Sequence, residues 1–377
     1  MDRLHLFGRT AFFNASHVYE FIEMSTPYTT VAPVRIGVLG CANIARQFIR
    51  DVRGSSVAFV DAVASRSGQT AHTFAIENGV ARNFSSYEAM LEDPGIEAIY
   101  LPLPNSMHAE WVIKAANAGK HVLCEKPLAV SRQEVESMFE AADRNGTVLL
   151  EAYPYWFQPQ MQALRELVAS GTIGEVRSVS ASFGFQVGSP KTNIRLKPEL
   201  GGGALLDAGS YTASLVRLVM GCAPSRVTAR SVMTDSGVDI STMALFEYDD
   251  GRRAQISCAM DGANHRHATI VGSEGTIYTE YLNHTSDVAG GDERGYLPSR
   301  MCVRRGMAQT IPFEDVSSRA GSGFLFAAEM FARLVRGVEP RTILGDAERA
   351  SLDIAATLDA ISESARSGAM VSVSGTY

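Results

Sequence analysis

From Val34 onward, short apolar runs alternate with segments that have helical periodicity. The run Val34–Leu39 is nearly continuous, which is typical of a strand buried on both faces. The same pattern predicts further strands over 57–64, 96–101, 121–124 and 147–150, and helices over 44–52, 71–75, 85–92, 105–118 and 131–144. Ser131 is expected to cap the last helix, with Glu134 completing a capping box. Strands that alternate with helices predict βαβ units and a doubly wound parallel sheet over residues 34–150.

The pattern changes after residue 151. Runs with strand character follow one another over 176–186, 226–233, 240–248, 252–260, 267–271, 275–281 and 301–312. No helix of crossover length separates most of them, so we expect an open, largely antiparallel sheet. A helix is predicted over 202–220, and two more, near 324–335 and 346–366, are expected to pack back on the first unit. The predicted fold class is therefore α/β, with an α+β domain over 151–377.

Residues 1–33 precede the first predicted strand, and we interpret them as an N-terminal extension. Asp2, Glu20 and Glu23 interrupt this segment, which lacks the apolar core and cleavage site of a signal peptide. Our hypothesis is that Met24 is the natural start of the protein. The alternative is a native helix around residues 12–23 that packs on the body.

Composition excludes several classes of partner and site. No apolar run approaches the ~18–20 residues that span a bilayer. The net charge of −7, without a basic stripe, argues against a nucleic-acid partner. The five cysteines form no C-x-x-C pair, which favours a reduced, cytoplasmic protein over a disulfide framework or a structural zinc site. The histidines show no metal-binding spacing, so we expect no metal.

The first predicted strand ends in a glycine loop with the sequence Gly40-Cys41-Ala42-Asn43-Ile44-Ala45. Rossmann dinucleotide-binding loops have G-x-G-x-x-G/A at this place, and here Ala42 replaces the second glycine. A small residue still permits close approach of a pyrophosphate, and the following helix offers its N-terminal amides to an anion. The sequence therefore predicts an NAD(P)-binding Rossmann domain over 34–150.

The end of the second predicted strand indicates which cofactor is bound. NAD sites usually place a carboxylate there, whereas this chain has Ser65 and Arg66, which suit a 2′-phosphate. Asp61 is the competing candidate, but it lies inside the strand, ahead of the expected ribose position. We therefore expect NADP rather than NAD, with a solvated surface charge as the alternative role of Arg66.

Two segments carry candidate catalytic residues. Lys126, restrained by Pro127, follows the strand 121–124, and ligands bind at the carboxyl ends of such strands. Asp207 and Tyr211 stand four apart on a predicted helix and hence on one face. A lysine and a tyrosine together are suited to proton transfer at a carbonyl oxygen. The alternatives are a surface lysine, a capping aspartate and a partly buried tyrosine.

These segments resemble the glucose–fructose oxidoreductase/inositol dehydrogenase/MocA (Gfo/Idh/MocA) family. The matching motifs occur in family order: the Gly40 to Ala45 loop, Leu103-Pro104-Asn105-x-x-His108, Ala118 to Val122, Glu125-Lys126-Pro127, Gly171-x-Ile173-Gly174-Glu175, and Gly201-Gly202-Gly203 through Tyr211. Many relatives have histidine where Tyr211 stands. The tyrosine resembles the branch that contains dimeric dihydrodiol dehydrogenases, NADP-dependent xylose dehydrogenases, glucose–fructose oxidoreductase and nucleotide-sugar 3-ketoreductases.

The resemblance implies a Rossmann domain followed by an α+β domain whose open sheet forms a homodimer or homotetramer. It implies that Lys126 lies near the nicotinamide and that Asp207 and Tyr211 line the substrate site. Besides the glycine loop, the expected cofactor site comprises Ser65, Arg66, Tyr87, Leu103, Pro104, Asn105, His108, Glu125 and Lys126.

Additional substrate contacts are expected from Tyr153, Asn193 and Arg195. The alternatives are core packing for Tyr153 and an ordinary polar loop for Asn193 and Arg195. His265 and His267 lie on a predicted strand, where they either touch substrate or face water.

The predicted function is NADP-dependent hydride transfer at a carbinol or carbonyl carbon of a sugar or sugar-like substrate. Tyr211 would be the acid or base, Lys126 would lower its pKa, and Asp207 would orient a neighbouring hydroxyl. One alternative is a nucleotide-linked ketosugar 3-reductase. The other is a non-catalytic dinucleotide-binding sensor, which would need only the phosphate loop.

Overall fold

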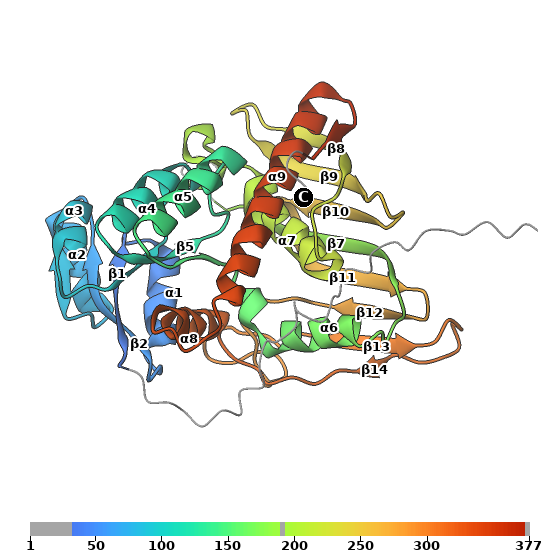
Figure 1. Ribbon diagram of the computed structural model, residues 1–377, viewed down its shortest axis with the longest axis horizontal. Coiled ribbons are helices and arrows are strands. Elements are labelled where there is room, and N and C mark those ends of the chain that lie inside the picture. The colour runs from blue at the N-terminus through green and yellow to red at the C-terminus, as the bar shows by residue number, and fades with distance from the viewer. Residues whose placement is uncertain (1–31, 189–192, 374–377) are drawn as a thin grey trace, which may run out of the picture.

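The computed structural model describes residues 32–188 and 193–373. The expectations for Met24 and for a helix over 12–23 therefore lie outside the described residues. Two sheets with their helices form the body, and the long helix α9 runs between them (Figure 1).

The first sheet has six parallel strands in the order β3-β2-β1-β4-β5-β6. This is the order of a doubly wound dinucleotide-binding sheet, and it confirms the predicted fold class. The strands are β1 (Val34–Leu39), β2 (Ala58–Ala64), β3 (Arg82–Phe84), β4 (Ala98–Leu101), β5 (His121–Glu125) and β6 (Leu149–Ala152). β3 was not predicted, because three residues are too few to show a period.

The helices between these strands also match the prediction. They are α1 (Asn43–Val52), α2 (Gly68–Glu77), α3 (Tyr87–Glu92), α4 (His108–Asn117) and α5 (Arg132–Arg144). Ser131 caps α5 as expected, because its Oγ accepts from the Glu134 amide at 3.3 Å. The capping box is wrong in one detail: the Glu134 carboxylate accepts from the amide of Val130, not from that of Ser131.

The second sheet has nine strands in the order β14-β13-β12-β11-β7-β10-β9-β8-β15. Only the β7–β10 pair is parallel, so the expected open, largely antiparallel sheet is confirmed. The strands are β7 (Val176–Gln186), β8 (Arg226–Met233), β9 (Asp239–Glu247), β10 (Arg253–Ala259), β11 (Asp261–Gly272), β12 (Gly275–Thr279), β13 (Met301–Arg305), β14 (Glu314–Asp315) and β15 (Val371–Ser372).

Several elements of the second unit differ from the prediction: the short strands β14 and β15 were not predicted, and β11 begins at Asp261 rather than at residue 267. The run 301–312 is a strand only as far as Arg305, and helix α6 (Pro159–Ala169) was not predicted. Pro159 starts α6, since proline is favoured at the first helical position, where no amide donor is needed.

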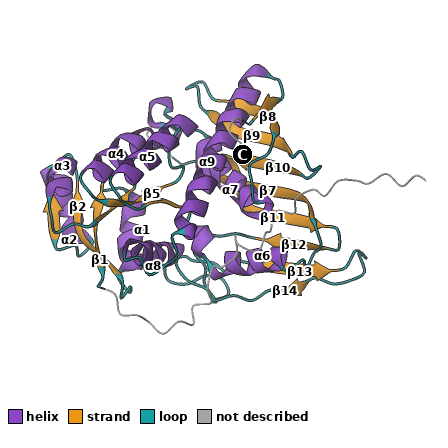
Figure 2. Ribbon diagram, viewed as in Figure 1, coloured by secondary structure: helices purple, strands orange, loops and turns teal. Residues whose placement is uncertain are grey.

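Helices cover one face of the second sheet. α7 (Ser210–Met220) packs on β7 and β10, and α9 (Thr342–Ser367) packs on β8. Side chains of β9 alternate between the two faces of the sheet. Ala244 and Phe246 are buried on the face that the helices cover, whereas Met243 and Leu245, on the opposite face, are 66% and 57% exposed. Figure 2 shows these helices on one side of the sheet. The sheet is thus open on its other face.

Helix α8 (Gly323–Val335) belongs late in the chain but packs on the first sheet. The Phe324 ring lies edge-on to Phe48 at 5.6 Å and to Tyr100 at 6.2 Å. α8 therefore shares one hydrophobic core with β1 and α1.

Candidate active site

Lys126 follows β5, at the carboxyl edge of the parallel sheet, and the Lys126–Pro127 peptide bond is cis. Its Nζ donates to the Asp207 carboxylate Oδ1 at 2.8 Å and to the Asp207 carbonyl at 2.9 Å. The Lys126 side chain is only 11% exposed. The structure therefore joins two segments 81 residues apart in the sequence through one buried ion pair.

Asp207 lies in a π-helical turn, Leu205–Gly209, that leads into α7. A continuous α-helix was predicted here. Gly203 has a φ of +118°, and a Cβ at this position would lie 2.2 Å from the Asp239 carboxylate, so only glycine fits. Asp239 also accepts from the Leu205 amide at 2.8 Å, which anchors the turn. Turns of this kind are frequent at functional sites.

Despite this turn, Asp207 and Tyr211 contact the same amine, as predicted. Lys126 Nζ lies 4.5 Å from the centre of the Tyr211 ring. Arg195 donates to the other Asp207 carboxylate oxygen, Oδ2. Burial would raise the pKa of Asp207, but the positive charges of Lys126 and Arg195 lower it to about 2. Burial would lower the pKa of Lys126, but Asp207 raises it, so the amine is held as a cation.

The Tyr211 hydroxyl accepts a hydrogen bond from Asn283 Nδ2 at 2.9 Å. Because the oxygen is an acceptor in this bond, its own proton remains available for another group. Burial raises the pKa of Tyr211, whereas the charges of Lys126 and Arg266 lower it. The site thus contains a buried tyrosine hydroxyl beside two cations.

Sequence reasoning missed Asn283 and Arg266. Asn283 follows β12 in an irregular segment, where no pattern distinguishes it. Arg266 could have been found, because strand alternation places it on the same face of β11 as the buried Ala268 and Ile270. His265 and His267 alternate with it, and His265 interacts with Ser182 Oγ at 2.9 Å.

The three additional substrate candidates occupy different environments. Arg195 reaches the centre of the site through Asp207. Tyr153 is fully buried, lies edge-on to the Tyr211 ring at 5.4 Å and supports it from the core side. The Asn193 side chain makes only local hydrogen bonds that hold its own loop: its Oδ1 accepts from the Arg195 amide, and its Nδ2 donates to the Gly188 carbonyl.

The phosphate loop has the geometry that a dinucleotide needs. Gly40 has a φ of +124°, and a Cβ there would lie 2.9 Å from Leu103 Cδ2. Ala42, the residue before α1, offers no capping side chain. The first amides of α1 are therefore left for an anion, as a bound pyrophosphate requires. The Ala42 methyl group does not prevent this turn.

The expected 2′-phosphate residues gather beside this loop. The Tyr87 hydroxyl lies over Gly40 and interacts with the Arg66 side chain. Arg66 is exposed at the end of β2, next to the half-buried Ser65. Asp61, the competing NAD residue, forms an ion pair with Arg82 at 2.9 Å inside the sheet. The residues present therefore fit NADP.

The remaining cofactor candidates connect loops. His108 is fully buried, and its two ring nitrogens lie 2.8 and 2.9 Å from the Leu103 and Pro127 carbonyls. Both ring nitrogens therefore face protein carbonyls, and the expected contact between His108 and the cofactor stays a prediction. Glu125 is buried, and one of its carboxylate oxygens accepts from the Tyr100 hydroxyl at 2.6 Å. Its contact with the cofactor also stays a prediction.

The loop that begins at Pro104 is tied to the second unit. Pro104 precedes a short 3₁₀ turn (Asn105–Met107), and Asn105 Nδ2 donates to the Gly201 carbonyl at 2.8 Å. The glycine run that leads to Asp207 is thereby fixed against the cofactor half of the site.

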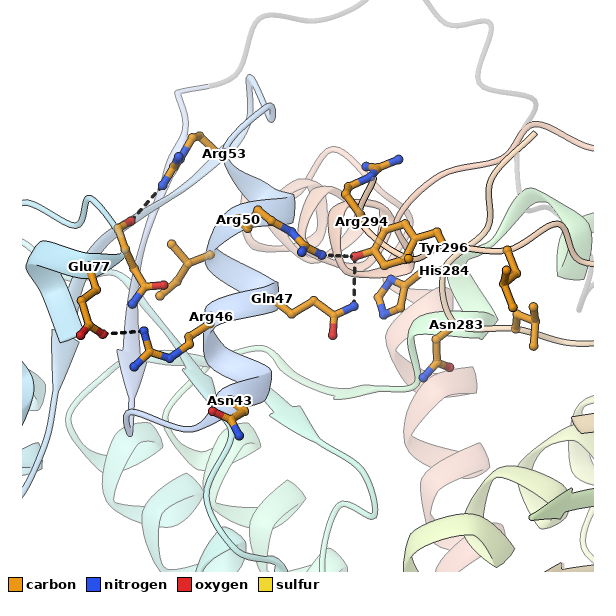
Figure 3. A pocket seen from close by; sticks show the side chains of 15 residues that line it. Asn43, Arg46, Gln47, Arg50, Arg53, Glu77, Asn283, His284, Arg294 and Tyr296 are labelled. Carbon is orange, nitrogen blue, oxygen red and sulfur yellow. Dashed lines mark hydrogen bonds and ion pairs between the residues drawn. The ribbon is translucent and has the colours of Figure 1, made fainter. Parts of the chain in front are cut away.

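An open pocket of about 740 Å³ runs along α1 (Figure 3). Asn43 of the phosphate loop lies at one end, and Asn283, the partner of Tyr211, lies on one wall. Lys126, Asp207 and Tyr211 do not line it. Four arginines do line it, which suits a polyanionic ligand, although several are paired with acidic groups: Arg46, Arg50, Arg53 and Arg294.

Within residues 32–188 and 193–373, no group of three or more histidine, cysteine or acidic side chains is placed to hold a metal ion. The same residues contain no helix that is long and apolar enough to cross a membrane.

Comparison with known proteins relates both halves of the chain to one family. Residues 34–153 match the oxidoreductase family with an NAD-binding Rossmann fold, and residues 161–278 match the GFO/IDH/MocA C-terminal domain. The chain is 35% identical over 337 residues to D-xylose 1-dehydrogenase (NADP(+)) 2 of Haloferax volcanii, covering 89% of this chain and 98% of that protein.

Two further relatives act on nucleotide-linked sugars or were solved with nucleotide ligands. The dTDP-3,4-didehydro-2,6-dideoxy-α-D-glucose 3-reductase of Saccharopolyspora spinosa is 33% identical, covering 89% of this chain and 98% of that protein. A 3-ketoreductase of Actinomadura kijaniata, solved with NADP and TDP-benzene, superposes with a TM-score of 0.76 at 31% identity, covering 88% and 98% of the two chains.

Proposed function

The chain belongs to the GFO/IDH/MocA oxidoreductase family, and from this premise we propose its reaction. It is an NADP-dependent oxidoreductase that transfers a hydride between the nicotinamide and a carbinol or carbonyl carbon of a sugar or sugar-like substrate. The observation that carries this proposal is the meeting of Lys126, Asp207 and Tyr211 at the carboxyl end of β5. A sensor that only binds a dinucleotide would not need this set.

The proposal assigns the domains by what each holds. Residues 34–150 bind the cofactor through the Gly40 loop, Ser65, Arg66 and Tyr87. Residues 151–377 supply Arg195, Asp207 and Tyr211 to the substrate. When bound, NADP supplies the exchange of a hydride at the nicotinamide ring.

Tyr211 exchanges a proton with the substrate oxygen. In reduction its hydroxyl donates to the carbonyl, and in oxidation its phenolate accepts the hydroxyl proton. Asn283 donates to the hydroxyl oxygen of Tyr211 and so directs the Tyr211 proton toward the substrate. Lys126, held as a cation, favours the phenolate and the developing charge on the substrate oxygen.

Asp207 orients a neighbouring substrate hydroxyl. One carboxylate oxygen already accepts from Lys126 and the other from Arg195. A carboxylate offers about four acceptor positions, so capacity for a substrate hydroxyl remains. Because its pKa is about 2, Asp207 is an acceptor and not an acid at neutral pH.

A substrate panel tests this proposal. NADP⁺ and NAD⁺ are each supplied with aldoses, cyclitols and dihydrodiols, and NADPH with ketosugars, while absorbance at 340 nm is followed. Oxidation of an aldose with a clear preference for NADP⁺ supports the proposal. A strong preference for NAD⁺, or no turnover in any combination, contradicts it.

A nucleotide-linked ketosugar 3-reductase is the second candidate. The likeness to the S. spinosa and A. kijaniata proteins favours it, since it extends over almost the whole of both. The same panel separates the two, because reduction of a dTDP-linked ketosugar without oxidation of free aldoses identifies the reductase.

We also propose that the open face of the second sheet forms a homodimer or homotetramer, and that the protein works in the cytoplasm. The exposed Met243 and Leu245 support the first, and five free thiols support the second. In sedimentation velocity, a Met243→Lys, Leu245→Glu double variant should lose its oligomer. Met307→Lys is the control, because Met307 is 84% exposed and lies in the loop after β13, not on a strand of the sheet. A double variant that keeps the oligomer contradicts this interface.

A further inference from the structure

Arg266 is a half-buried residue in the middle of β11, and its Nε and Nη2 atoms are buried. Alternation along β11 turns it to the same face as Ala268 and Ile270, both 0% exposed. Its guanidinium therefore points into the core of the second unit and not toward the solvent-facing His265 and His267 side.

Aromatic rings surround this guanidinium. Its central carbon lies 4.2 Å from the ring centre of Tyr211 and 4.6 Å from that of Tyr281. The rings of Phe183 and Tyr155 follow at 4.8 and 5.2 Å. Ring faces attract a cation, but they do not satisfy its N–H donors.

Within the described parts of the chain, Arg266 forms no ion pair with a carboxylate. Its Nε and Nη2 are buried and lack hydrogen-bond partners. Burial of a charge without an anionic partner is unfavourable, and an apolar side chain would fill the same space. This arrangement therefore indicates that the charge is needed at some stage of the reaction.

The neighbours of Tyr211 identify that stage. Charged and titratable side chains surround it from β4, the end of β5 and the turn after it, the segment after β6, the 3₁₀ turn Ile194–Leu196, the π turn, β11 and the segment after β12. They are Tyr100, Glu125, Lys126, Tyr153, Tyr155, Arg195, Asp207, Arg266 and Tyr281. Lys126, Arg195 and Arg266 are positive, but Lys126 and Arg195 are already paired with Asp207.

We propose that Arg266 is a positioning residue for Tyr211. The guanidinium of Arg266 is the counter-charge of the Tyr211 phenolate that forms in each catalytic cycle. The inference rests on the proposed function, in which Tyr211 exchanges the proton. During oxidation the substrate hydroxyl proton moves to the phenolate oxygen, while the carbon–hydrogen electron pair leaves as hydride to NADP⁺. Before that transfer, Arg266 balances the negative oxygen; after it, Tyr211 is neutral.

Arg266→Met keeps the length of the side chain and removes its charge. A cation at this distance typically changes the acidity of its neighbour by at least about one pH unit. The alkaline rise of kcat for oxidation should therefore move up by about one pH unit or more, and kcat at pH 7 should fall about tenfold. KM should change less than threefold. Arg266→Lys should restore most of the wild-type pH profile.

Arg304→Met is the matched control. The Arg304 Nε is likewise buried without a partner, and its guanidinium lies 4.3 Å from Phe313, but Arg304 is on β13 and does not contact Tyr211. This variant should keep the wild-type pH profile. An unshifted profile in Arg266→Met, or an equal shift in Arg304→Met, overturns the proposal.

A spectroscopic titration covers the case in which Arg266→Met does not fold. Absorbance at 295 nm is measured against pH, and the Tyr211 phenolate signal is the wild-type curve minus the Tyr211→Phe curve. The same difference is then measured between Arg266→Lys and the double variant Arg266→Lys, Tyr211→Phe. The proposal expects Tyr211 to ionise at a similar pH in both, and a rise of more than one pH unit in the lysine variant contradicts it. A wild-type rate in Tyr211→Phe would instead refute the proposed function.

Discussion

Replacing Asp207 by asparagine removes the charge that holds Lys126 and Arg195 together. The pKa of the Asp207 carboxyl falls from an ordinary 3.8 to about 2 in the folded protein, because two cations outweigh its burial. At about 1.4 kcal/mol per pH unit, this shift stabilises the folded state by about 2.5 kcal/mol at pH 7. The side chain is only 18% exposed, so solvent screens little of this.

The sign of the pH dependence follows from the lowered pKa. The stabilisation is complete above pH ~5 and is lost as the pH falls through the folded pKa, so about half remains at pH 3. Asparagine has no such dependence. The wild type should therefore exceed Asp207→Asn by about 2–3 kcal/mol in unfolding free energy at pH 7, and by about half of that at pH 3.

Urea unfolding followed by far-UV circular dichroism measures this difference at pH 7, 5, 4 and 3. Asp359→Asn is a suitable control, because burial raises the pKa of Asp359 and its pH dependence has the opposite sign. A difference below about 0.5 kcal/mol at pH 7, as for an exposed pair, would refute the reasoning. So would a difference that does not shrink between pH 5 and pH 3.

Two further predictions concern the cofactor and a second buried carboxyl. Arg66→Ala should raise KM for NADP⁺ by about 10- to 100-fold and leave KM for NAD⁺ within about twofold, because one charge-assisted bond to the 2′-phosphate is lost; equal effects on both cofactors in steady-state assays would contradict this placement. Glu151 is buried against the Leu128 amide and the Ser351 hydroxyl, and burial raises its pKa to about 7. The wild type should therefore lose stability as the pH rises through 7, whereas the thermal unfolding temperature of Glu151→Gln should vary less between pH 5 and 9. Equal slopes of unfolding temperature against pH in the two proteins would exclude this carboxyl as the cause.

Elements whose signal is local could be predicted. β1 and β7 have the predicted bounds, because each is a nearly continuous apolar run or an alternation that stops just before a glycine-containing loop. The place of Lys126 could be predicted, because the carboxyl edge of a parallel sheet is a fixed place in the fold. That Asp207, 81 residues later, lies at the same site was implied by the family resemblance.

Features set by distant contacts could not be predicted. The π turn at Asp207 depends on the approach of Gly203 to Asp239, which belongs to another strand. The ring nitrogens of His108 are occupied by two carbonyls that only the folded loops bring together. Asn283 reaches Tyr211 from an irregular segment 72 residues later, where no periodicity exists.

The central claim is that Tyr211, supported by Lys126, exchanges the proton during NADP-dependent hydride transfer. Its most direct test is kcat for the best panel substrate in wild type, Tyr211→Phe and Lys126→Ala, at saturating NADP⁺ and substrate. Loss of the proton donor or of its cation should lower kcat by about 10²-fold or more in each variant. Near-normal rates in both variants would contradict the claim.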